Sequence, residues 1–423
     1  MLSVDLMADP LYEELVSRGF VHTVTNADGF GAALARQQTF YVGFDPTAKS
    51  LHTGHLIPLA LAGHLARAGH QPILLAGGGT GMIGDPTDRS ATRAMLEVEQ
   101  VRVNTTAIQA QVERMPSLAG INVEVVNNAD WLSDLRYLDF LRDSGRDFSV
   151  NEILSTETYR ARLQDGKGLN FVEINYRLLQ AYDFLHLFRE RGCLLQIGGS
   201  DQWSNILAGV DLIRRIEGGE AFGLVTPLLT TSTGEKMGKT KGGALWLDQH
   251  MTSPFDFYQY WVNVEDIAIE QVFSLLTTLP MDEIRELASR KGPATAVVKQ
   301  RLAKEVTAVV HGIDAAEAAH EAAQSLFGAG AGSVDAAPET YVSAAQVDSG
   351  LHVVELLVTT GLVESRGAAR RLVQQGGAYV NEQRVDPPDR IITTADFGQG
   401  EMLLRSGKKR YHRVRLGEQN KDE

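Results

Sequence analysis

The sequence predicts an α/β protein whose first half is a doubly wound parallel sheet, followed by a helical segment and a small C-terminal domain. Three observations support this prediction. Short apolar runs of strand length alternate with longer helical patterns up to about residue 230. Only helical patterns follow from about residue 254 to residue 326. A stretch rich in Gly and Ala then precedes a compact, more basic tail.

Five apolar runs are predicted to be buried strands. They are TFYVGFD (39–45), PILLAGGG (72–79), NVEVVNN (122–128), CLLQIGG (193–199) and GLVTPLL (223–229). Helical patterns lie at about 55–68, 132–143, 171–191 and 201–216, and the acidic, amphipathic N-terminus predicts a further helix. Because strands that alternate with helices form parallel sheets, we expect ligands at the carboxyl ends of these strands.

These patterns divide the chain into four expected parts. Residues 1–232 form the sheet domain, 233–327 carry a lysine-rich loop and the helical segment, 328–345 form a linker, and 346–423 form the C-terminal domain. The linker rests on GAGAGSVDAAPET (328–340), whose small and polar residues are typical of a connection between domains.

Composition excludes several classes of protein. The chain is 43% hydrophobic and 22% charged, as in ordinary globular proteins, and it contains no run of 18 apolar residues that would predict a membrane span. The N-terminus lacks the basic and apolar regions of a secretory signal. The single cysteine, Cys193, excludes an intramolecular disulfide and any zinc site with two thiolates. We therefore expect a cytoplasmic protein with no membrane partner and no protein-bound metal site.

Charge is distributed unevenly along the chain. The formal net charge is −13, but residues 351–415 contain 11 Lys and Arg against 7 Asp and Glu. A basic module on an acidic body favours a polyanionic partner for the tail, although a solvated surface gives the same counts. Eight of these 11 basic residues form two groups, the first on one helix face and the second near the end: Arg366, Arg370 and Arg371, then Lys408, Lys409, Arg410, Arg413 and Arg415.

The stretch FDPTAKSLHTGHL (44–56) places His52 and His55 just after a predicted strand. A zinc site would need further Cys or His ligands, and no such pattern lies nearby. A structural histidine pair is a second interpretation. The pair lies at a predicted helix start beside Gly54, where backbone N–H groups and the positive end of the helix dipole collect. Contact with a phosphate is therefore the interpretation that we favour.

A glycine-rich stretch, GTGMIG (79–84), matches the dinucleotide-binding pattern G-x-G-x-x-G. That pattern requires a helix running through its third glycine. Here Gly84 is followed by Asp85 and Pro86, and a proline disfavours helical geometry at the residue before it. The pattern therefore fails in its context, which argues against a nicotinamide-dependent oxidoreductase.

The stretch GEKMGKTKGG (234–243) spaces Lys236, Lys239 and Lys241 between glycines. It is either a solvated turn or a loop that closes over a triphosphate and neutralises a leaving pyrophosphate. It lacks the Walker A pattern G-x-x-x-x-G-K-[ST].

Polar residues also follow one stripe of the apolar helix at 170–188, where Tyr176, Gln180 and Asp183 share a face. This stripe faces either solvent or a small polar ligand. IGGSDQW (197–203) ends a predicted strand and presents Asp201 at a helix start. That carboxylate is either a helix cap or an acceptor for a ribose hydroxyl.

Together these stretches resemble the bacterial tyrosyl-tRNA synthetases, a family of class I aminoacyl-tRNA synthetases. HTGH is similar to the family's HIGH motif and KMGKT to its KMSKS loop, while YVGFDPTAKSLHTGH, GDPT, LLQAYDF and QIGGSDQW match in order and approximate spacing. Residues 357–385 resemble a small αL-type RNA-binding domain. The resemblance implies a Rossmann-like catalytic domain, an α-helical anticodon-side domain and an α+β RNA-binding domain.

The resemblance also implies a role for each matched residue. For the phosphates of ATP it implies Thr47, His52 and His55, and for the rest of the ATP site Asp45, Gly54, Gly199, Asp201, Met237 and Gly238. For the tyrosine phenol it implies Tyr41 and Asp183, for the α-amino group Asp85, Tyr176 and Gln180, and for the carboxylate Gln202. For the leaving pyrophosphate it implies Lys236, Lys239, Arg89 and Arg93, and for tRNA it implies Arg366, Arg370, Arg371, Lys408, Lys409 and Arg410.

The implied reaction is the activation of L-tyrosine by ATP, with Mg²⁺ accompanying the nucleotide, followed by transfer of the tyrosyl group to tRNA(Tyr). The resemblance also implies a homodimer. The chain departs from the family at Thr53, where HIGH has Ile or Val, a change expected to matter little if the side chain faces away from ATP. A tryptophanyl-tRNA synthetase and a non-catalytic RNA-binding paralogue are the remaining alternatives. The Tyr41 and Asp183 pair argues against the first, and the intact histidines and lysines argue against the second.

Overall fold

The computed structural model describes residues 9–85, 96–166, 169–240, 243–327, 338–398, 400–407 and 410–417. The chain divides into two compact units, Met1–Ser253 with Tyr260–Ile313 and Pro254–Gln259 with Asp314–Glu423. This division differs from the boundary expected at residue 233. The reason is that α12 (Ile269–Leu276), in the helical segment, contacts both α1 (Pro10–Arg18) and α3 (Leu56–Arg67).

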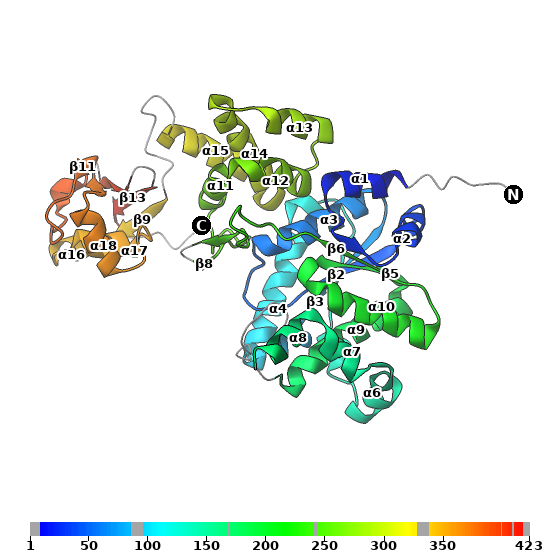
Figure 1. The fold of residues 1–423 in the computed structure, drawn as a ribbon. Helices are drawn as coiled ribbons and strands as arrows, with labels where there is room; N and C mark the ends of the chain where they lie inside the picture. Colours follow the sequence, from blue (N-terminus) through cyan, green and yellow to red (C-terminus); the bar gives the residue numbers. More distant parts are fainter. Residues whose placement is uncertain are drawn as a thin grey trace. The chain divides into compact units, whose positions relative to one another are not determined.

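A six-stranded sheet lies at the centre of the first unit (Figure 1). Its strands, in spatial order, are β1 (Thr23–Val24), β6 (Phe222–Thr226), β5 (Cys193–Gly199), β2 (Thr39–Phe44), β3 (Gln71–Ala76) and β4 (Glu124–Asn127). All neighbouring strands pair in parallel except β1 and β6. The expected doubly wound sheet and its five strands are therefore confirmed, with one short antiparallel strand added at the edge.

Helices cover both faces of this sheet (Figure 1). On one face α3 contacts β2, β3 and β5, and on the other α9 (Phe171–Arg191) and α10 (Trp203–Glu217) contact β5. Because both faces are covered, β3 and β6 do not alternate between buried and exposed residues, and only Gln71 at the start of β3 is not fully buried. Tyr41 on β2 packs with Phe184 on α9 and Leu212 on α10. Side chains alternate along a strand, so the next residue, Val42, points to the opposite face.

The order of the strands reverses between β2 and β5. From β2 the chain continues through β3 to β4 on one side, whereas β6 follows β5 on the other. In open parallel sheets, ligands bind outside the carboxyl ends of the strands at such a reversal. The fold therefore places the ends of β2 and β5 at the position where a ligand is expected.

The local sequence explains where the helices begin and end. Asp9 precedes α1, and its carboxylate accepts a hydrogen bond from the Leu11 N–H at 2.9 Å. At the start of α9, the side chains of Asn170 and Glu173 form a capping box, and Gly192 in the left-handed region (φ 59°) ends that helix. Further helices of this unit are α2 (Ala27–Leu34), α4 (Val98–Glu113), α7 (Val150–Ser155), α8 (Glu157–Gln164), α13 (Met281–Ser289) and α14 (Pro293–His311).

The structure differs from one helix expected from the sequence, at 132–143, and agrees with the absence of a helix expected at 79–84. The helix expected at 132–143 is two helices, α5 (Ala129–Leu132) and α6 (Tyr137–Asp143), since Arg136 between them has an extended backbone (ψ 120°). The stretch 79–84 contains only one 3-10 turn (Thr80–Met82), and Gly84 adopts a φ of 82°. Within the described residues, no helix therefore runs through Gly84, as the sequence predicted.

The second unit contains part of α11 (Pro254–Val262), α15 (Ile313–Phe327) and a C-terminal domain. The domain has a five-stranded sheet in the order β11 (Gln383–Arg384), β10 (Ala378–Val380), β12 (Glu401–Ser406), β13 (Arg410–Leu416) and β9 (Glu339–Val342). Its helices are α16 (Ala344–Asp348), α17 (Val353–Thr359) and α18 (Arg366–Gln374). Of the linker expected at 328–345, residues 328–337 lie outside the described residues, and β9 belongs to the sheet because it pairs in parallel with β13.

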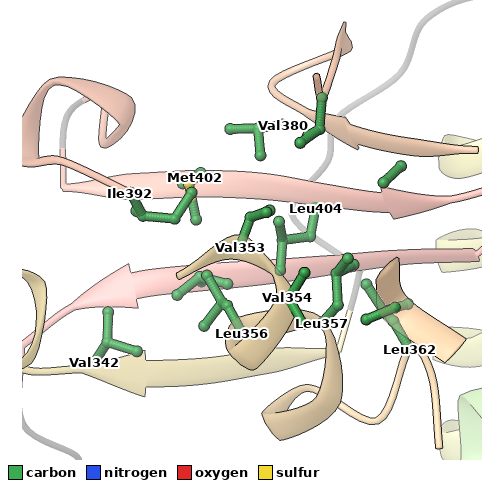
Figure 2. Packing of buried hydrophobic residues seen from close by; sticks show 14 of the residues in the cluster. Val342, Val353, Val354, Leu356, Leu357, Leu362, Val380, Ile392, Met402 and Leu404 are labelled. Carbon is green, nitrogen blue, oxygen red and sulfur yellow. The ribbon is translucent and has the colours of Figure 1, made fainter. Parts of the chain in front are cut away.

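The C-terminal domain has its own hydrophobic core. Figure 2 shows Val353, Leu356 and Leu357 of α17 packing beside Met402 and Leu404 of β12. These five side chains are at most 1% exposed. The domain therefore buries apolar residues of its own, as its expected α+β organisation requires. In the part of the chain that the structure describes, no helix has the length and apolar character to cross a membrane.

Candidate active site

A cavity of about 1160 Å³ lies at the carboxyl ends of β2 and β5. Fourteen of the residues predicted from the sequence line it: Tyr41, Asp45, Thr47, His52, Gly54, His55, Asp85, Tyr176, Gln180, Asp183, Gly199, Asp201, Gln202 and Lys236. Met237 lines a small neighbouring cavity instead. Arg89, Arg93 and the side chain of Lys239 lie outside the described residues. The reversal of strand order thus brings together residues from five separate stretches of sequence.

The two histidines hold the turn that precedes α3. His52 Nδ1 accepts a hydrogen bond from the Gly54 N–H at 3.1 Å, and His55 Nδ1 accepts one from the His52 N–H at 3.1 Å. Their rings stack with centroids 4.1 Å apart. The structural and the phosphate-binding interpretations of this pair are therefore compatible, since capping uses only the Nδ1 atom of each ring.

The free edge of each ring is a hydrogen-bond donor. Burial lowers the pKa of His52 and lowers that of His55 well below its usual range, so both rings are neutral near pH 7. A neutral ring whose Nδ1 accepts a backbone N–H carries its proton on Nε2. Both residues line the cavity. The turn therefore supplies two neutral N–H donors, which suit phosphate oxygens without adding a positive charge.

Gly54 has a steric reason to be glycine. A Cβ at this position would lie 2.8 Å from Cε1 and 3.0 Å from Nδ1 of the His52 ring. The absence of a side chain therefore lets His52 fold back over the turn that it caps. This requirement is independent of the space for adenine that the family resemblance implies.

A buried acid and a buried phenol lie at the inner end of the cavity. Asp183 is 2% exposed, and it accepts hydrogen bonds from Asn128 Nδ2 at 2.9 Å and Trp131 Nε1 at 2.7 Å. Tyr41 is 1% exposed, and its hydroxyl has no hydrogen-bond partner among the described residues. A buried hydroxyl without a partner is unfavourable unless a ligand supplies one. The pair is therefore suited to a ligand that carries its own hydroxyl.

The Asp183 carboxyl is expected to make folding of the ligand-free protein less favourable as the pH rises from about 4 to about 7. Burial raises its pKa to about 7, whereas in an unfolded chain the group titrates near about 3.9. Between these values the folded protein binds more protons than the unfolded chain, so its stability falls with rising pH. The measurement is the free energy of unfolding of the parent minus that of Asp183→Asn, by urea denaturation across this range. A difference that does not change with pH would contradict the raised pKa.

Four residues expected to bind small ligands are hydrogen-bonded to one another. The Tyr176 hydroxyl donates to Asp45 Oδ2 at 2.9 Å, and Gln202 Nε2 donates to Asp85 Oδ2 at 2.7 Å. Asp45 also accepts a hydrogen bond from the Thr80 hydroxyl at 2.8 Å. Asp45, expected to bind ATP, thus orients side chains around the cavity, because both of its carboxylate oxygens already have protein donors.

The lysine loop contacts the rest of the site at Lys236 and Gly238. Lys236 Nζ lies 3.4 Å from Asp201 Oδ2, so the two residues expected to contact pyrophosphate and ribose form an ion pair with each other. Gly238 has a φ of 85°, and a Cβ there would lie 1.6 Å from Thr53 Oγ1. Thr53 is 3% exposed. Its side chain packs against the lysine loop and does not line the large cavity, so the expectation that the change to Thr53 matters little stays a prediction.

Three residues of the cavity region were not predicted from the sequence. Asn128 and Trp131 hold Asp183, and Gln196 on β5 lines the cavity with its Oε1 buried and unpaired among the described residues. Gln196 stood out as the single polar residue in an apolar strand, and Asn128 directly follows a strand. The sequence positions of Gln196 and Asn128 could therefore have indicated a site, whereas nothing in the sequence near Trp131 did. No group of three His, Cys, Asp or Glu in the described ranges is arranged to hold a metal ion.

The basic residues of the C-terminal domain differ in their contacts. Arg366, Arg370 and Arg371 on α18 are exposed, and Arg366 forms an ion pair with Glu355 at 2.9 Å. Arg410 donates to the carbonyl oxygens of Gly361 and Leu362, both at 2.9 Å. Arg413 is 6% exposed, and Arg413 and Arg415 pair with Glu339. The second basic cluster is therefore largely structural where it is described, and Lys408 and Lys409 lie outside the described residues.

Two family models match the chain. The model described as tRNA synthetases class I (W and Y) matches residues 34–328, and the one described as Tyrosine--tRNA ligase SYY-like C-terminal domain matches residues 334–414. The first match contains every residue that lines the cavity. The second contains β9 to β12 and the three helices of the C-terminal domain.

Similar proteins agree with these matches. The tyrosine–tRNA ligase of Acetivibrio thermocellus is 47% identical over 96% of this chain and 99% of its own length, and that of Desulfatibacillum aliphaticivorans is 46% identical over 96% and 98%. The C-terminally truncated mitochondrial tyrosyl-tRNA synthetase of Aspergillus nidulans has a similar structure, with a TM-score of 0.67 and 31% identity over 75% of this chain and 94% of that one. The chain therefore belongs to the class I aminoacyl-tRNA synthetases, in the family of the tyrosine–tRNA ligases.

Proposed function

We propose that this protein is a tyrosine–tRNA ligase. It activates L-tyrosine with magnesium ATP, forming tyrosyl-adenylate and pyrophosphate, and then transfers the tyrosyl group to the 3′ end of tRNA(Tyr). One structural observation supports this proposal in addition to family membership. A buried hydroxyl and a buried carboxylate, Tyr41 and Asp183, line the same cavity as the histidine turn. Tyr41 and Asp183 are suited to a phenol, and the two histidines of the turn are suited to phosphates.

The first step needs positioning more than proton transfer. The tyrosine carboxylate is already ionised when it attacks the α-phosphorus, so a bond from oxygen to phosphorus forms as the bond to pyrophosphate breaks, without a general base. Negative charge then increases on the phosphate oxygens. The Nε2–H groups of His52 and His55 and the ammonium groups of Lys236 and Lys239 are the proposed donors to these oxygens. The Asp201 carboxylate is the proposed acceptor for a ribose hydroxyl once Lys236 turns toward pyrophosphate.

Tyrosine-dependent exchange of pyrophosphate into ATP is the experiment that tests the proposal. Each amino acid is supplied separately, with no tRNA present. Exchange with tyrosine alone would support both the reaction and the preference for a phenol. Exchange with tryptophan would instead assign the chain to the tryptophanyl branch, and the absence of exchange with any amino acid would favour a non-catalytic RNA-binding paralogue.

We further propose that the protein is a homodimer, through the segment between β4 and β5. Seven of the fifteen large hydrophobic residues that are exposed in the described chain lie in this segment: Tyr137, Leu138, Leu141, Val150, Leu163, Phe171 and Val172. Leu138 is 76% exposed and Phe171 is 64% exposed. Such a concentration of exposed apolar residues is typical of a surface that another chain covers.

The dimer is tested with Leu138→Glu. This variant is expected to become monomeric in sedimentation equilibrium, because a charge cannot be buried in an apolar interface without a partner. Ile267→Glu is the matched control, since Ile267 is 80% exposed and lies outside the segment. A parent protein that is monomeric at every concentration would contradict the proposal.

For tRNA, the exposed arginines of α18 are the proposed contacts with the phosphate backbone, together with Lys408 and Lys409. Arg410 is a weaker candidate, because its guanidinium already donates to two carbonyl groups. The proposed location is the cytoplasm, where tRNA charging takes place. Contacts of this kind predict that tRNA affinity falls as salt is raised, which a filter-binding titration measures.

A further inference from the structure

The lysine loop is connected to the histidine turn by a short ladder of backbone hydrogen bonds. The Leu245 N–H donates to the Gly238 carbonyl oxygen at 2.8 Å, and the Thr53 N–H donates to the Leu245 carbonyl oxygen at 3.0 Å. Trp246 then forms an antiparallel bridge with His52. The position of the loop is therefore linked to the element that supplies the two histidine donors.

The contact between loop and turn depends on Gly238. Its φ of 85° lies in the left-handed region, and its missing Cβ leaves the space that Thr53 Oγ1 occupies. Lys236 and Lys239 lie two residues before and one residue after Gly238. A group that fixes the backbone of Gly238 therefore fixes the starting points of both lysine side chains.

Tyr260 on α11 holds that backbone. Its hydroxyl oxygen accepts a hydrogen bond from the Gly238 N–H at 2.7 Å. The Tyr260 ring lies edge-on to Trp261, with centroids 5.1 Å apart, and Trp261 is fully buried. The phenol is thus presented from a packed helix and is not itself part of the loop. Tyr260 does not line the cavity.

The same part of the chain holds the loop at a second point. The Glu265 carboxylate accepts hydrogen bonds from the Ser232 N–H at 2.7 Å and from the Ser232 hydroxyl at 2.9 Å. Ser232 lies at the start of the loop and Gly238 at its centre. Residues 260–265 therefore support the loop both where it begins and where its lysines are attached.

We propose that Tyr260 is a positioning residue for adenylate formation, whose hydroxyl anchors Gly238 so that Lys236 and Lys239 reach the leaving pyrophosphate from a fixed backbone. This inference rests on the proposed function. Tyr260 acts through the loop and does not touch substrate. Loss of its hydroxyl should therefore change the rate of the first reaction step and leave tyrosine binding as it is.

Tyr260→Phe tests the anchor, because it removes only the acceptor for the Gly238 N–H. The kcat for tyrosine-dependent pyrophosphate exchange is expected to fall by roughly fivefold or more, the factor that corresponds to a donor left without its partner. The KM for tyrosine is expected to stay the same. Transfer of the tyrosyl group from preformed adenylate to tRNA should also be unchanged, since pyrophosphate has already left.

Tyr258→Phe is the matched control. It deletes the same group from the same helix, where the hydroxyl contacts His320 Nδ1 at 2.8 Å. The kcat of Tyr258→Phe for pyrophosphate exchange is expected to stay within about twofold of the parent value. This factor corresponds to the lower end of the net contribution of a hydrogen bond. Equal losses in both variants would overturn the anchor, and so would a loss in Tyr260→Phe that is confined to the KM for tyrosine.

Amide hydrogen exchange of residues 234–240 tests, independently of catalysis, whether the Tyr260 hydroxyl holds the backbone of Gly238. Exchange there is expected to be faster in Tyr260→Phe than in the parent and unchanged in Tyr258→Phe. Unchanged exchange in Tyr260→Phe would overturn the proposal. A parent protein without tyrosine-dependent activity would contradict the proposed function alone, because the hydrogen exchange result would still establish or refute the anchor.

Discussion

Replacing His52 by asparagine is expected to slow adenylate formation by roughly 100- to 1000-fold, the usual cost of losing one donor to developing charge. The asparagine Oδ1 can take the place of His52 Nδ1 as acceptor for the Gly54 N–H, whereas its NH₂ group lies one bond closer to the backbone than Nε2 and does not reach the same position. The variant therefore separates the capping role from the phosphate role. Single-turnover formation of tyrosyl-adenylate in a rapid-quench experiment is the measurement.

Tyrosine affinity and thermal stability are the internal controls for this variant. Both are expected to remain close to the parent values, since the cap is kept and the histidine turn does not contact the phenol pair in any hydrogen bond of the described chain. His22→Asn is the matched variant, because His22 is exposed, its Nδ1 contacts Thr23 Oγ1, and it does not line the cavity. A normal rate in His52→Asn would show that the histidine is only a cap. A large loss of stability would show that asparagine does not replace the cap.

Replacing Asp183 by asparagine is expected to reduce the preference for tyrosine over phenylalanine by roughly 10- to 150-fold, which corresponds to a hydrogen bond to a charged group. An amide is a weaker acceptor than a carboxylate for the substrate hydroxyl. Its NH₂ group also faces Asn128 Nδ2 or Trp131 Nε1, both of which are donors. The ratio of kcat/KM for the two amino acids, measured by pyrophosphate exchange, gives the preference directly.

Two further variants show whether the change in preference comes from the Asp183 carboxylate. Tyr41→Phe removes a hydroxyl that has no partner in the described chain, so we expect a smaller loss of preference, on the order of 2- to 10-fold, with no loss of thermal stability. Asp211→Asn on α10 changes an exposed ion pair with Arg214 and is expected to alter neither quantity. An unchanged preference in Asp183→Asn would assign phenol recognition to other residues.

Much of the first unit could be predicted because its signals are local. The strands are continuous apolar runs, so β2 to β6 were found within a few residues of their true ends. The histidines that cap the turn are separated by only two residues, and their interaction is a property of that short stretch. The long helix α9 carries both of its caps in its own sequence. The break between α5 and α6 was missed because the helical pattern continues across it.

Contacts between distant residues could not be predicted in the same way. Gln202 meets Asp85 across 117 residues, and Trp131 meets Asp183 across 52. Each residue alone has several plausible roles, and the direction of its side chain depends on how the helices pack on the sheet. Arg410 illustrates the same point in the C-terminal domain, where the sequence did not predict that its guanidinium donates to two carbonyl groups.

The parallel sheet, the order of the motifs and the family resemblance could be read from the sequence alone, because the hydrophobic period, the positions of glycine and proline and the short motifs are local features of the chain. The interactions between distant groups became known only from the folded structure. It paired Lys236 with Asp201, left the Tyr41 hydroxyl without a partner and placed the Tyr260 hydroxyl on Gly238. The physical reason is that pKa values, buried hydrogen bonds and close backbone contacts depend on neighbours in space, which the fold brings together from distant parts of the chain.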